Sequence, residues 1–304
     1  MTTRRETPDV EVPVTHADRL VFPDEGITKG QVVSYYRSVA AVMLPHLANR
    51  PLTLQRYPHG IAGSGFIQQD ITTSGLPEWM GRAEVPKEGG GTVLHAVANR
   101  PEALVWLANQ NCLTPHVWLS RVSRPETPDR MVIDFDPAEE DFGTVRAAAR
   151  ATRDVLTELG LVAFVQTTGS RGLHVVVPLS GHADFATVRG FARDVAELIV
   201  ADDPASRTLA ARKADRGDRV YLDVLRNGYA QTMVAPYAVR ARPGAPVATP
   251  LDWNELGHRD MSARRYTLRS VPRRLAQRED PWAELAAQAR SLTPARRRLD
   301  QRRA

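Results

Sequence analysis

The sequence predicts an α+β protein with mixed or antiparallel sheets flanked by helices. Short apolar runs with strand character follow one another directly in several places along the 304 residues, as in hairpins. Elsewhere, long amphipathic segments with helical spacing separate such runs. A uniform alternation of strands and helices, as in a doubly wound parallel sheet, is absent, and this irregular order favours α+β.

The composition is that of an ordinary globular protein, with 42% hydrophobic and 25% charged residues. No apolar run is long enough to span a membrane, and the N-terminus has no apolar segment typical of an export signal. The single cysteine, Cys112, excludes an internal disulfide and a cysteine-rich metal site. We therefore expect a cytoplasmic, nucleoid-associated protein with no membrane partner. Forty basic against 35 acidic residues favour a polyanionic partner, although many proteins are equally basic.

The first half of the chain predicts three strands and two helices. Thr28 is placed to cap a long helix, because apolar residues such as Val32, Tyr36 and Met43 recur after it at helical spacing. The expected elements are, in order, a strand over 19–23, a helix over 29–47, a strand over 51–58, a helix over 100–112 and a strand over 116–122.

The second half predicts five strands and three helices. Gly160 is a typical residue to follow the end of a helix, and Gly169 and Gly172 are suited to a tight turn between two strands. The expected elements are a strand over 130–136, a helix over 142–160, two strands within 161–179, a helix over 184–200, strands over 218–225 and 232–241, and a helix over 281–292 in a basic tail.

The stretch MVIDFDP, residues 131–137, ends an apolar strand with two acids separated by one aromatic residue. Because side chains i and i+2 of a strand share a face, Asp134 and Asp136 lie side by side, opposite Phe135. Two like charges so close raise each other's pKa unless a cation lies between them. The triplet alone is also common in turns and helix caps, so a metal site needs further support.

Three further clusters could support chemistry. In TTGSRGLHVVVP, residues 167–178, glycines allow a tight turn whose N–H groups, hydroxyls and arginine could bind an anion, although an ordinary glycine hairpin has the same pattern. Asp223 ends another apolar strand, where a local ion pair is the plain alternative. Arg240 and Arg242 have the spacing of one strand face, which suits phosphate binding but also a solvated edge.

Taken in order, these motifs resemble the polymerase domain of bacterial ligase D, in the archaeo-eukaryotic primase superfamily. The resemblance extends from THADRLVFP to TPLDWNEL, and includes Asp-x-Asp-Pro, Ser-Arg-Gly-Leu-His, an acid before Leu-Arg-Asn, and Ala-Pro-Tyr-x-x-Arg. It implies two lobes, with the catalytic acids in one that is similar to an RNA-recognition fold. We therefore expect one catalytic domain over 1–304, with lobes at about 10–125 and about 126–255 and a helical basic tail at about 256–304.

The resemblance implies a nucleotidyltransferase that adds NTPs or dNTPs to a primer or a DNA end, with a preference for ribonucleotides. Asp134, Asp136 and Asp223 are then its catalytic metal ligands. Such sites hold two cations about 3.5–4 Å apart, and ligands that are all oxygen suit Mn²⁺ or Mg²⁺. Expected DNA substrates are gaps, primer-templates and broken ends.

The same resemblance implies nucleotide-binding residues and a 5′-phosphate pair. Ile67 stands where relatives have a second base-stacking aromatic, so the stacking platform is altered. Arg171 replaces a lysine of many relatives and keeps the charge, and Arg226 is at a variable position. The expected nucleotide-binding residues are Phe66, His116, Thr168, Ser170, Arg171, His174, Arg216, Arg226 and Arg240, and those for the DNA 5′-phosphate are Arg19 and Lys29.

The sequence has no Lys-x-Asp-Gly ligase motif and no nuclease module rich in histidine and aspartate. We therefore expect a separate ligase that acts in trans, and an end-binding protein as a further partner. Double-strand-break joining, gap filling in excision repair and priming all remain open. So do two other classes: a non-catalytic module that binds DNA ends or gaps, and a metal-dependent nuclease or phosphatase.

Overall fold

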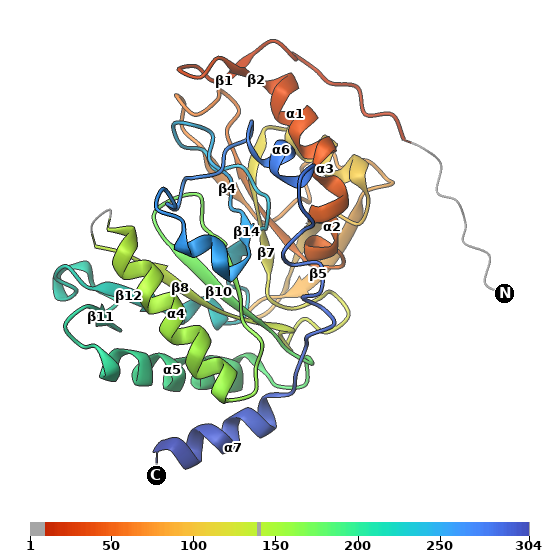
Figure 1. Ribbon diagram of the computed structural model, residues 1–304. Helices are drawn as coiled ribbons and strands as arrows, with labels where there is room; N and C mark the ends of the chain where they lie inside the picture. Colours follow the sequence, from red (N-terminus) through yellow and green to blue (C-terminus); the bar gives the residue numbers. More distant parts are fainter. Residues whose placement is uncertain (1–9, 139–140, 304) are drawn as a thin grey trace.

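Two six-stranded sheets form the body of the protein, and the α+β prediction is confirmed (Figure 1). The computed structural model describes residues 10–138 and 141–303. Residues 1–9, where we expected no export signal, lie outside the described residues. A short hairpin of β1 (Leu20–Phe22) and β2 (Ile27–Thr28) lies apart from the two sheets.

The first sheet has the strand order β13-β7-β3-β6-β5, and β4 pairs with β3. All of its pairings are antiparallel. We did not predict β4, β5 or β6, and β13 joins this sheet although its sequence lies in the range that we assigned to the catalytic lobe. The strands are β3 (Leu52–Arg56), β4 (Phe66–Gln68), β5 (Gly81–Pro86), β6 (Thr92–Val97), β7 (Cys112–Trp118) and β13 (Thr232–Val234).

The second sheet has the order β11-β12-β8-β10-β9-β14. It is mixed, because β11 and β12 pair in parallel while the other neighbours are antiparallel. The strands are β8 (Arg130–Asp136), β9 (Phe164–Thr167), β10 (Leu173–Pro178), β11 (Arg207–Thr208), β12 (Val220–Asp223) and β14 (Pro250–Leu251).

Helices pack against both sheets, and the C-terminal helix packs against a helix that covers the second sheet (Figure 1). Thr28 caps the first one as predicted, in a capping box with Gln31, but the helix expected over 29–47 is divided at Val39. The α-helices are α1 (Lys29–Ser38), α2 (Ala40–Leu47), α3 (Pro101–Asn109), α4 (Phe142–Glu158), α5 (Phe185–Asp202), α6 (Val271–Leu275) and α7 (Leu292–Arg303), with 3₁₀ turns η1 (Lys213–Asp215), η2 (Leu225–Asn227) and η3 (Trp253–Gly257). No helix within the described ranges is long and apolar enough to cross a membrane.

Two predicted elements in the last third of the chain are wrong. Residues 281–288 form successive turns instead of a helix, because Trp282 is buried and its indole N–H donates to the carbonyl of Val165, 3.1 Å away. The strand expected over 232–241 ends at Val234, and Tyr237 has a φ of 66°. Arg240 and Arg242 therefore do not share a strand face.

The face alternation predicted for MVIDFDP is confirmed. Met131, Ile133 and Phe135 lie in the apolar core that includes residues of α4 and α5, whereas Val132 belongs to the core of the first sheet. Asp134 and Asp136 therefore project from the face of β8 that is turned away from α4 and α5. This face borders a cavity that is also lined by residues of the first sheet.

Candidate active site

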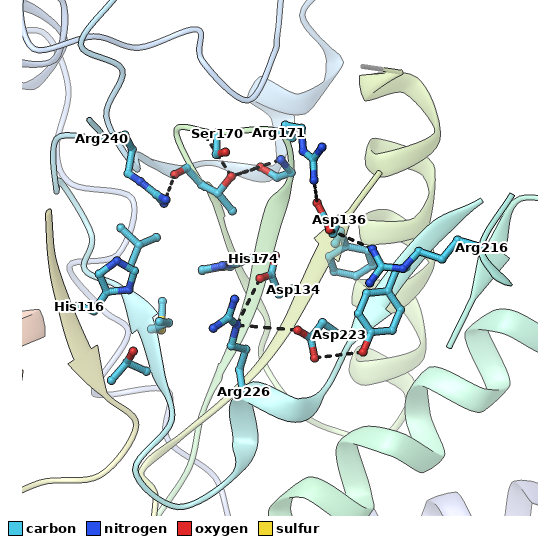
Figure 2. A pocket seen from close by; sticks show the side chains of 17 residues that line it. His116, Asp134, Asp136, Ser170, Arg171, His174, Arg216, Asp223, Arg226 and Arg240 are labelled. Carbon is cyan, nitrogen blue, oxygen red and sulfur yellow. Dashed lines mark hydrogen bonds and ion pairs between the residues drawn. The ribbon is translucent and has the colours of Figure 1, made fainter. Parts of the chain in front are cut away.

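Strand register brings the strongest candidate residues together in one cavity of about 220 Å³ (Figure 2). On β8, Asp134 lies opposite His174 of β10 on one side and opposite Asp223 of β12 on the other. Tyr221 of β12 lies opposite Asp136. Three adjacent antiparallel strands thus present an imidazole and two carboxylates in one row, a juxtaposition that requires the tertiary pairing.

Asp134 is the central member of this row. One of its oxygens is 3.5 Å from Nε2 of His174, and the other is 3.6 Å from Nε of Arg226. Burial acts to raise the pKa of Asp134, but His174, Arg226 and Arg240 together outweigh burial, so the pKa lies below its usual value. The carboxylate is therefore ionised at neutral pH and available as a ligand.

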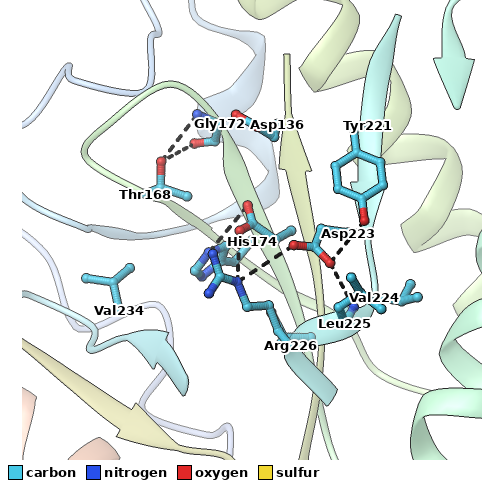
Figure 3. Close-up of polar contacts among 12 residues, drawn as sticks. Asp136, Thr168, Gly172, His174, Tyr221, Asp223, Val224, Leu225, Arg226 and Val234 are labelled. Carbon is cyan, nitrogen blue, oxygen red and sulfur yellow. Dashed lines mark hydrogen bonds and ion pairs between the residues drawn. The ribbon is translucent and has the colours of Figure 1, made fainter. Parts of the chain in front are cut away.

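The pKa of Asp223 is shifted in the opposite direction, above its usual value. Its Oδ1 accepts hydrogen bonds from the N–H of Leu225 at 2.8 Å and from the hydroxyl of Tyr221 at 3.4 Å (Figure 3). Burial raises its pKa, and repulsion from the charge of Asp134 raises it further. Arg226, whose Nε is 3.9 Å from Oδ2, compensates only in part. Two adjacent acids with opposed shifts form a pair that a cation would stabilise.

Asp136 is occupied by two arginines. Its two oxygens lie 3.0 Å from Nη2 of Arg171 and 3.0 Å from Nη1 of Arg216. Arg216 is largely buried, donates to the carbonyls of Ala210 and Ala211, and stacks on the ring of Tyr221, 4.0 Å from its centroid. Arg216 is therefore fixed, whereas Arg171 is half-exposed at the mouth of the cavity.

The carboxylate oxygens of the three aspartates suit a hard divalent cation, but the described residues are not arranged as a complete metal-coordination site. No group of three or more histidine, cysteine, aspartate or glutamate side chains in the described part of the chain has the geometry of a metal site. Asp134 and Asp223 lie opposite each other on neighbouring strands. Asp136 lies two residues further along the same face of β8 and contacts arginines. Their oxygens are the ligands that Mg²⁺ and Mn²⁺ prefer.

The glycine turn between β9 and β10 borders the acids. A side chain at Gly172 would place its Cβ 1.7 Å from the carbonyl oxygen of Phe135, so this close approach of turn and strand requires glycine. Gly169 has a φ of 63°. The hydroxyl of Thr168 accepts hydrogen bonds from the N–H groups of Ser170 and Gly172, 3.2 Å away in each case. Thr168 therefore shapes the turn, and Ser170 is left to face the cavity.

Residues on the opposite wall add positive charge. Arg240 donates to the carbonyl of Thr168 at 2.9 Å, and burial lowers its pKa to about 10, which leaves it charged. His116 of β7 lies across the cavity from the acids (Figure 2). Burial, followed by Arg240, Arg226 and His174, lowers the pKa of His116 to about 3. His116 is thus neutral at physiological pH and can act only as a hydrogen-bonding group.

Gln166 of β9 is a site residue that sequence reasoning missed. Its fully buried amide nitrogen is 3.3 Å from the carbonyl of Val234 and 3.2 Å from Nδ1 of His174. Because a carbonyl can only accept, the NH₂ group must lie there, so Nδ1 also accepts and Nε2 carries the proton towards Asp134. The available signal was a glutamine inside an apolar strand, since a buried amide requires partners.

Phe66 does not line this cavity. It lies on β4, 46% exposed, with the guanidinium of Arg56 5.4 Å from its ring centroid. Its neighbour Ile67 is 69% exposed. Both residues are exposed apolar side chains on β4, which pairs with β3. The structure therefore does not place the predicted base-stacking residue in the cavity of the three aspartates.

Arg19 and Lys29 lie together near the β1–β2 hairpin, outside the cavity. Lys29 is only 3% exposed, its ammonium donates to the hydroxyl of Thr15 at 3.0 Å, and no carboxylate of the described residues forms an ion pair with it. Burial and then the charge of Arg19 lower its pKa to about 8. Arg19 itself donates to the side chain of Asn111. Two cations in contact with neutral groups suit an anion from outside.

Comparison with known proteins identifies the family of this chain. The family model described as "LigD, primase-polymerase domain" matches residues 28–282. The Multifunctional non-homologous end joining protein LigD of Mycolicibacterium smegmatis is 34% identical over 281 residues, which cover 91% of this chain and 36% of that protein. Its counterpart in Pseudomonas aeruginosa is 30% identical over 290 residues, 94% of this chain and 34% of the relative. The chain thus spans about a third of the length of these relatives.

A solved structure matches nearly the whole fold. The polymerase domain from Mycobacterium tuberculosis ligase D, in complex with DNA, superimposes with a TM-score of 0.86 at 34% identity. The match covers 92% of this chain and 99% of that chain. The fold implied by the sequence motifs is therefore confirmed.

Proposed function

Because this chain belongs to the LigD primase-polymerase domain family, we propose that it is a metal-dependent polymerase that extends strands at DNA gaps and broken ends. The observation that carries the proposal is the single cavity in which Asp134, Asp136 and Asp223 lie beside four arginines. Like-charged acids suit divalent cations, and the arginines suit a triphosphate. Non-homologous end joining, named for the curated relatives, is the process that we propose for it.

Asp134 and Asp223 would hold the cation, and Asp136 would join them when Arg171 moves to the substrate. A divalent cation bound there supplies charge stabilisation for the attacking oxygen and the leaving pyrophosphate. The N–H of Leu225 and the hydroxyl of Tyr221 hold the Asp223 carboxylate in place. His174, oriented by Gln166, donates from Nε2 to Asp134 and so keeps this carboxylate ionised and fixed.

Arg171, Arg240 and the glycine turn would bind the triphosphate. Arg171 is half-exposed and can exchange Asp136 for a phosphate oxygen at little cost, whereas Arg216 keeps its two backbone carbonyl contacts in either state. Because phosphoryl transfer depends mainly on positioning and charge, the site needs no general base of its own.

A preference for ribonucleotides is a further proposal. His116 is neutral and borders the cavity, so its ring could hydrogen-bond a sugar hydroxyl without adding charge. One such bond contributes about 0.5–1.5 kcal/mol, which corresponds to a several-fold preference. Equal incorporation of both sugars with the same metal ion would reject this proposal.

Primer extension with labelled nucleotide and Mn²⁺, Mg²⁺ or chelator tests the main proposal. We expect a longer product with either metal ion and none with chelator. A shortened substrate would instead indicate a nuclease. Unchanged substrate, with DNA binding retained, would indicate a non-catalytic module that binds ends or gaps.

A further inference from the structure

A second cavity, of about 110 Å³, lies at the opposite end of β8 from the acids. Arg130, the first residue of this strand, is 2% exposed, and Asp136, the last, is six residues away. At about 3.3 Å per residue, roughly 20 Å of strand separates them. Arg50 and Arg121 line the same cavity, and both approach a single carboxylate, Asp129.

The partners of these arginines are unequal. Arg50 has its Nη2 2.6 Å from one oxygen of Asp129, and Arg121 has its Nε 2.7 Å from the other. Both arginines donate their hydrogen bonds to Oδ2 of Asp129, and Oδ1 has the ion-pair contact with Arg50 but no hydrogen bond from a described residue. Arg130 has no ion pair in the described part of the chain, and its buried Nε and Nη1 have no hydrogen-bond partner there. A guanidinium at this depth without a partner is unfavourable, since burial removes its hydration and no protein group replaces it.

The surrounding groups do not neutralise the excess. Three arginines against Asp129 leave two positive charges. His46 also lines the cavity, but burial lowers its pKa, and its Nε2 contacts Asp280 at 3.2 Å. Even if the charge of Asp280 behind His46 is counted, one positive charge remains uncompensated.

The shape of the cavity suits a small ligand. One water needs about 10–15 Å³ measured in this way, so a volume of about 110 Å³ exceeds the need of a single solvent molecule. Trp282, Leu285 and Ala289, in the turns that replace the predicted helix, line its outer side. The side chain of Arg121 is 35% exposed, so the cavity is accessible along this residue.

We propose that Arg50, Arg121 and Arg130 form a binding site for a tetrahedral oxyanion, a phosphate group or its sulfate analogue, distinct from the candidate active site. Planar guanidinium forks match the oxygens of such an anion, and the unpaired nitrogens of Arg130 supply donors that no described protein group uses. The bound anion joins residues that precede β3, follow β7 and begin β8 to the segment 282–289. It therefore stabilises the contact between the two sheets and the C-terminal part of the chain.

Thermal unfolding of the full chain in phosphate, sulfate or chloride at equal ionic strength tests this site. For one bound anion, the midpoint should rise by about 4 °C at a hundred-fold excess over Kd. Arg130→Met should abolish the rise with phosphate and sulfate. In chloride, Arg130→Met should be as stable as the wild type or more so, because it removes an uncompensated buried charge.

Arg171→Gln is the matched control, because it removes an arginine from the candidate active site, which can also bind phosphate. It should retain the phosphate-dependent rise. If Arg130→Met does not fold, the rim variant Arg121→Gln should still weaken the phosphate response several-fold. Equal rises in wild type and Arg130→Met, or equal effects of all three anions, would overturn the proposal.

Hydrogen exchange localises the effect and identifies the source of the phosphate. Inorganic phosphate should slow exchange in residues 281–290 of the wild type and of Arg171→Gln, but not of Arg130→Met. The small cavity favours a free anion. A 5′-phosphorylated oligonucleotide that protects the same residues, dependent on Arg130, would show that a nucleic-acid phosphate is the ligand. Protection of these residues in Arg130→Met would contradict the site.

Discussion

The two ends of strand β8 carry opposite charges, and these charges differ in burial and in their ion-pair partners. At the C-terminal end, Asp136 contacts Arg171 and Arg216, and Asp134 contacts Arg226 and the imidazole of His174. Arg171 and Arg226 are partly exposed. At the N-terminal end, Arg130 is buried, and its Nε and Nη1 have no hydrogen-bond partner among the described residues. Paired charges at an open cavity can exchange their partners for a substrate or a metal ion at low cost. An unpaired buried charge instead requires a ligand that stays bound.

This difference shows that one strand can carry candidate catalytic residues at one end and a residue proposed to bind a stabilising anion at the other. Alternation places Asp134 and Asp136 on one face, and the neighbouring strands add His174 and Asp223 in register. The length of β8 separates this site from Arg130, so each end can be changed without the other.

The largest expected effect is on catalysis at the acidic end. Asp136→Ala should lower primer extension by about 100- to 1,000-fold, the scale of losing one major transition-state stabiliser. DNA binding should persist. Arg130→Met, at the other end, should leave extension in phosphate-free buffer within about two-fold of wild type. Steady-state extension rates check both, and a comparable loss in the two variants would abolish the distinction between the ends.

The next effect concerns Arg19 and the buried Lys29, two positive charges that form no ion pair with a carboxylate of the described residues. A gap whose downstream strand carries a 5′-phosphate should bind at least about tenfold more tightly than one with a 5′-hydroxyl, since charged hydrogen bonds contribute roughly 1.5–3 kcal/mol each. Arg19→Ala combined with Lys29→Ala should erase this preference and leave extension on simple primer-templates intact. Binding titrations measure the difference, and equal affinity of the wild type for both gaps would exclude the site.

The same pair predicts a pH dependence. Lys29 has a pKa of about 8, below its ordinary value because of burial and Arg19. Its charge, and with it the preference for the 5′-phosphate, is complete well below pH 8 and declines as the pH rises through this value. A bound phosphate favours the charged form and shifts the decline to higher pH. A preference that stays constant from pH 7 to 10 would show that Lys29 does not contact the phosphate.

A smaller effect tests the role of Gln166 at the acidic end. Gln166→Leu removes the hydrogen-bond donor to Nδ1 of His174, so the proton is no longer held on Nε2, from which it is donated to Asp134. The rate of extension should therefore fall by about 10- to 100-fold at most. Gln166→Glu keeps the size of the side chain but accepts a hydrogen bond from a protonated Nδ1 instead of donating one, and should shift the pH profile of extension. A loss of stability in both variants without a changed pH profile would indicate a purely structural role.

The smallest expected effect is on stability. Burial and repulsion from Asp134 both raise the pKa of Asp223. Asp223→Asn removes this repulsion, so the thermal midpoint of the variant should be about 1–3 °C higher in metal-free buffer. Mn²⁺ should stabilise the wild type and not the variant. Calorimetry with and without Mn²⁺ measures this, and a lower midpoint for Asp223→Asn would show that Arg226 outweighs the repulsion.

The sequence by itself determined the features that depend on local geometry. Alternation along β8 placed Asp134 and Asp136 on one face, Thr28 caps α1, and the glycine turn lies where Gly169 and Gly172 predicted it. These follow from backbone periodicity and from steric limits that neighbouring residues impose. The ordered motifs also identified the family, because their combination is specific.

Tertiary structure alone decided which distant residues meet. Gln166 reaches Val234, 68 positions later, because β13 crosses to the first sheet. Trp282 lies in a turn instead of the expected helix, because its side chain is buried and donates a hydrogen bond to Val165 of β9. From the sequence, Arg130 is an ordinary first residue of a strand, and only the packing of Arg50 and Arg121 around Asp129 shows that it forms no ion pair within the described ranges. Pairing and burial depend on long-range contacts, and no local pattern encodes which contacts will form.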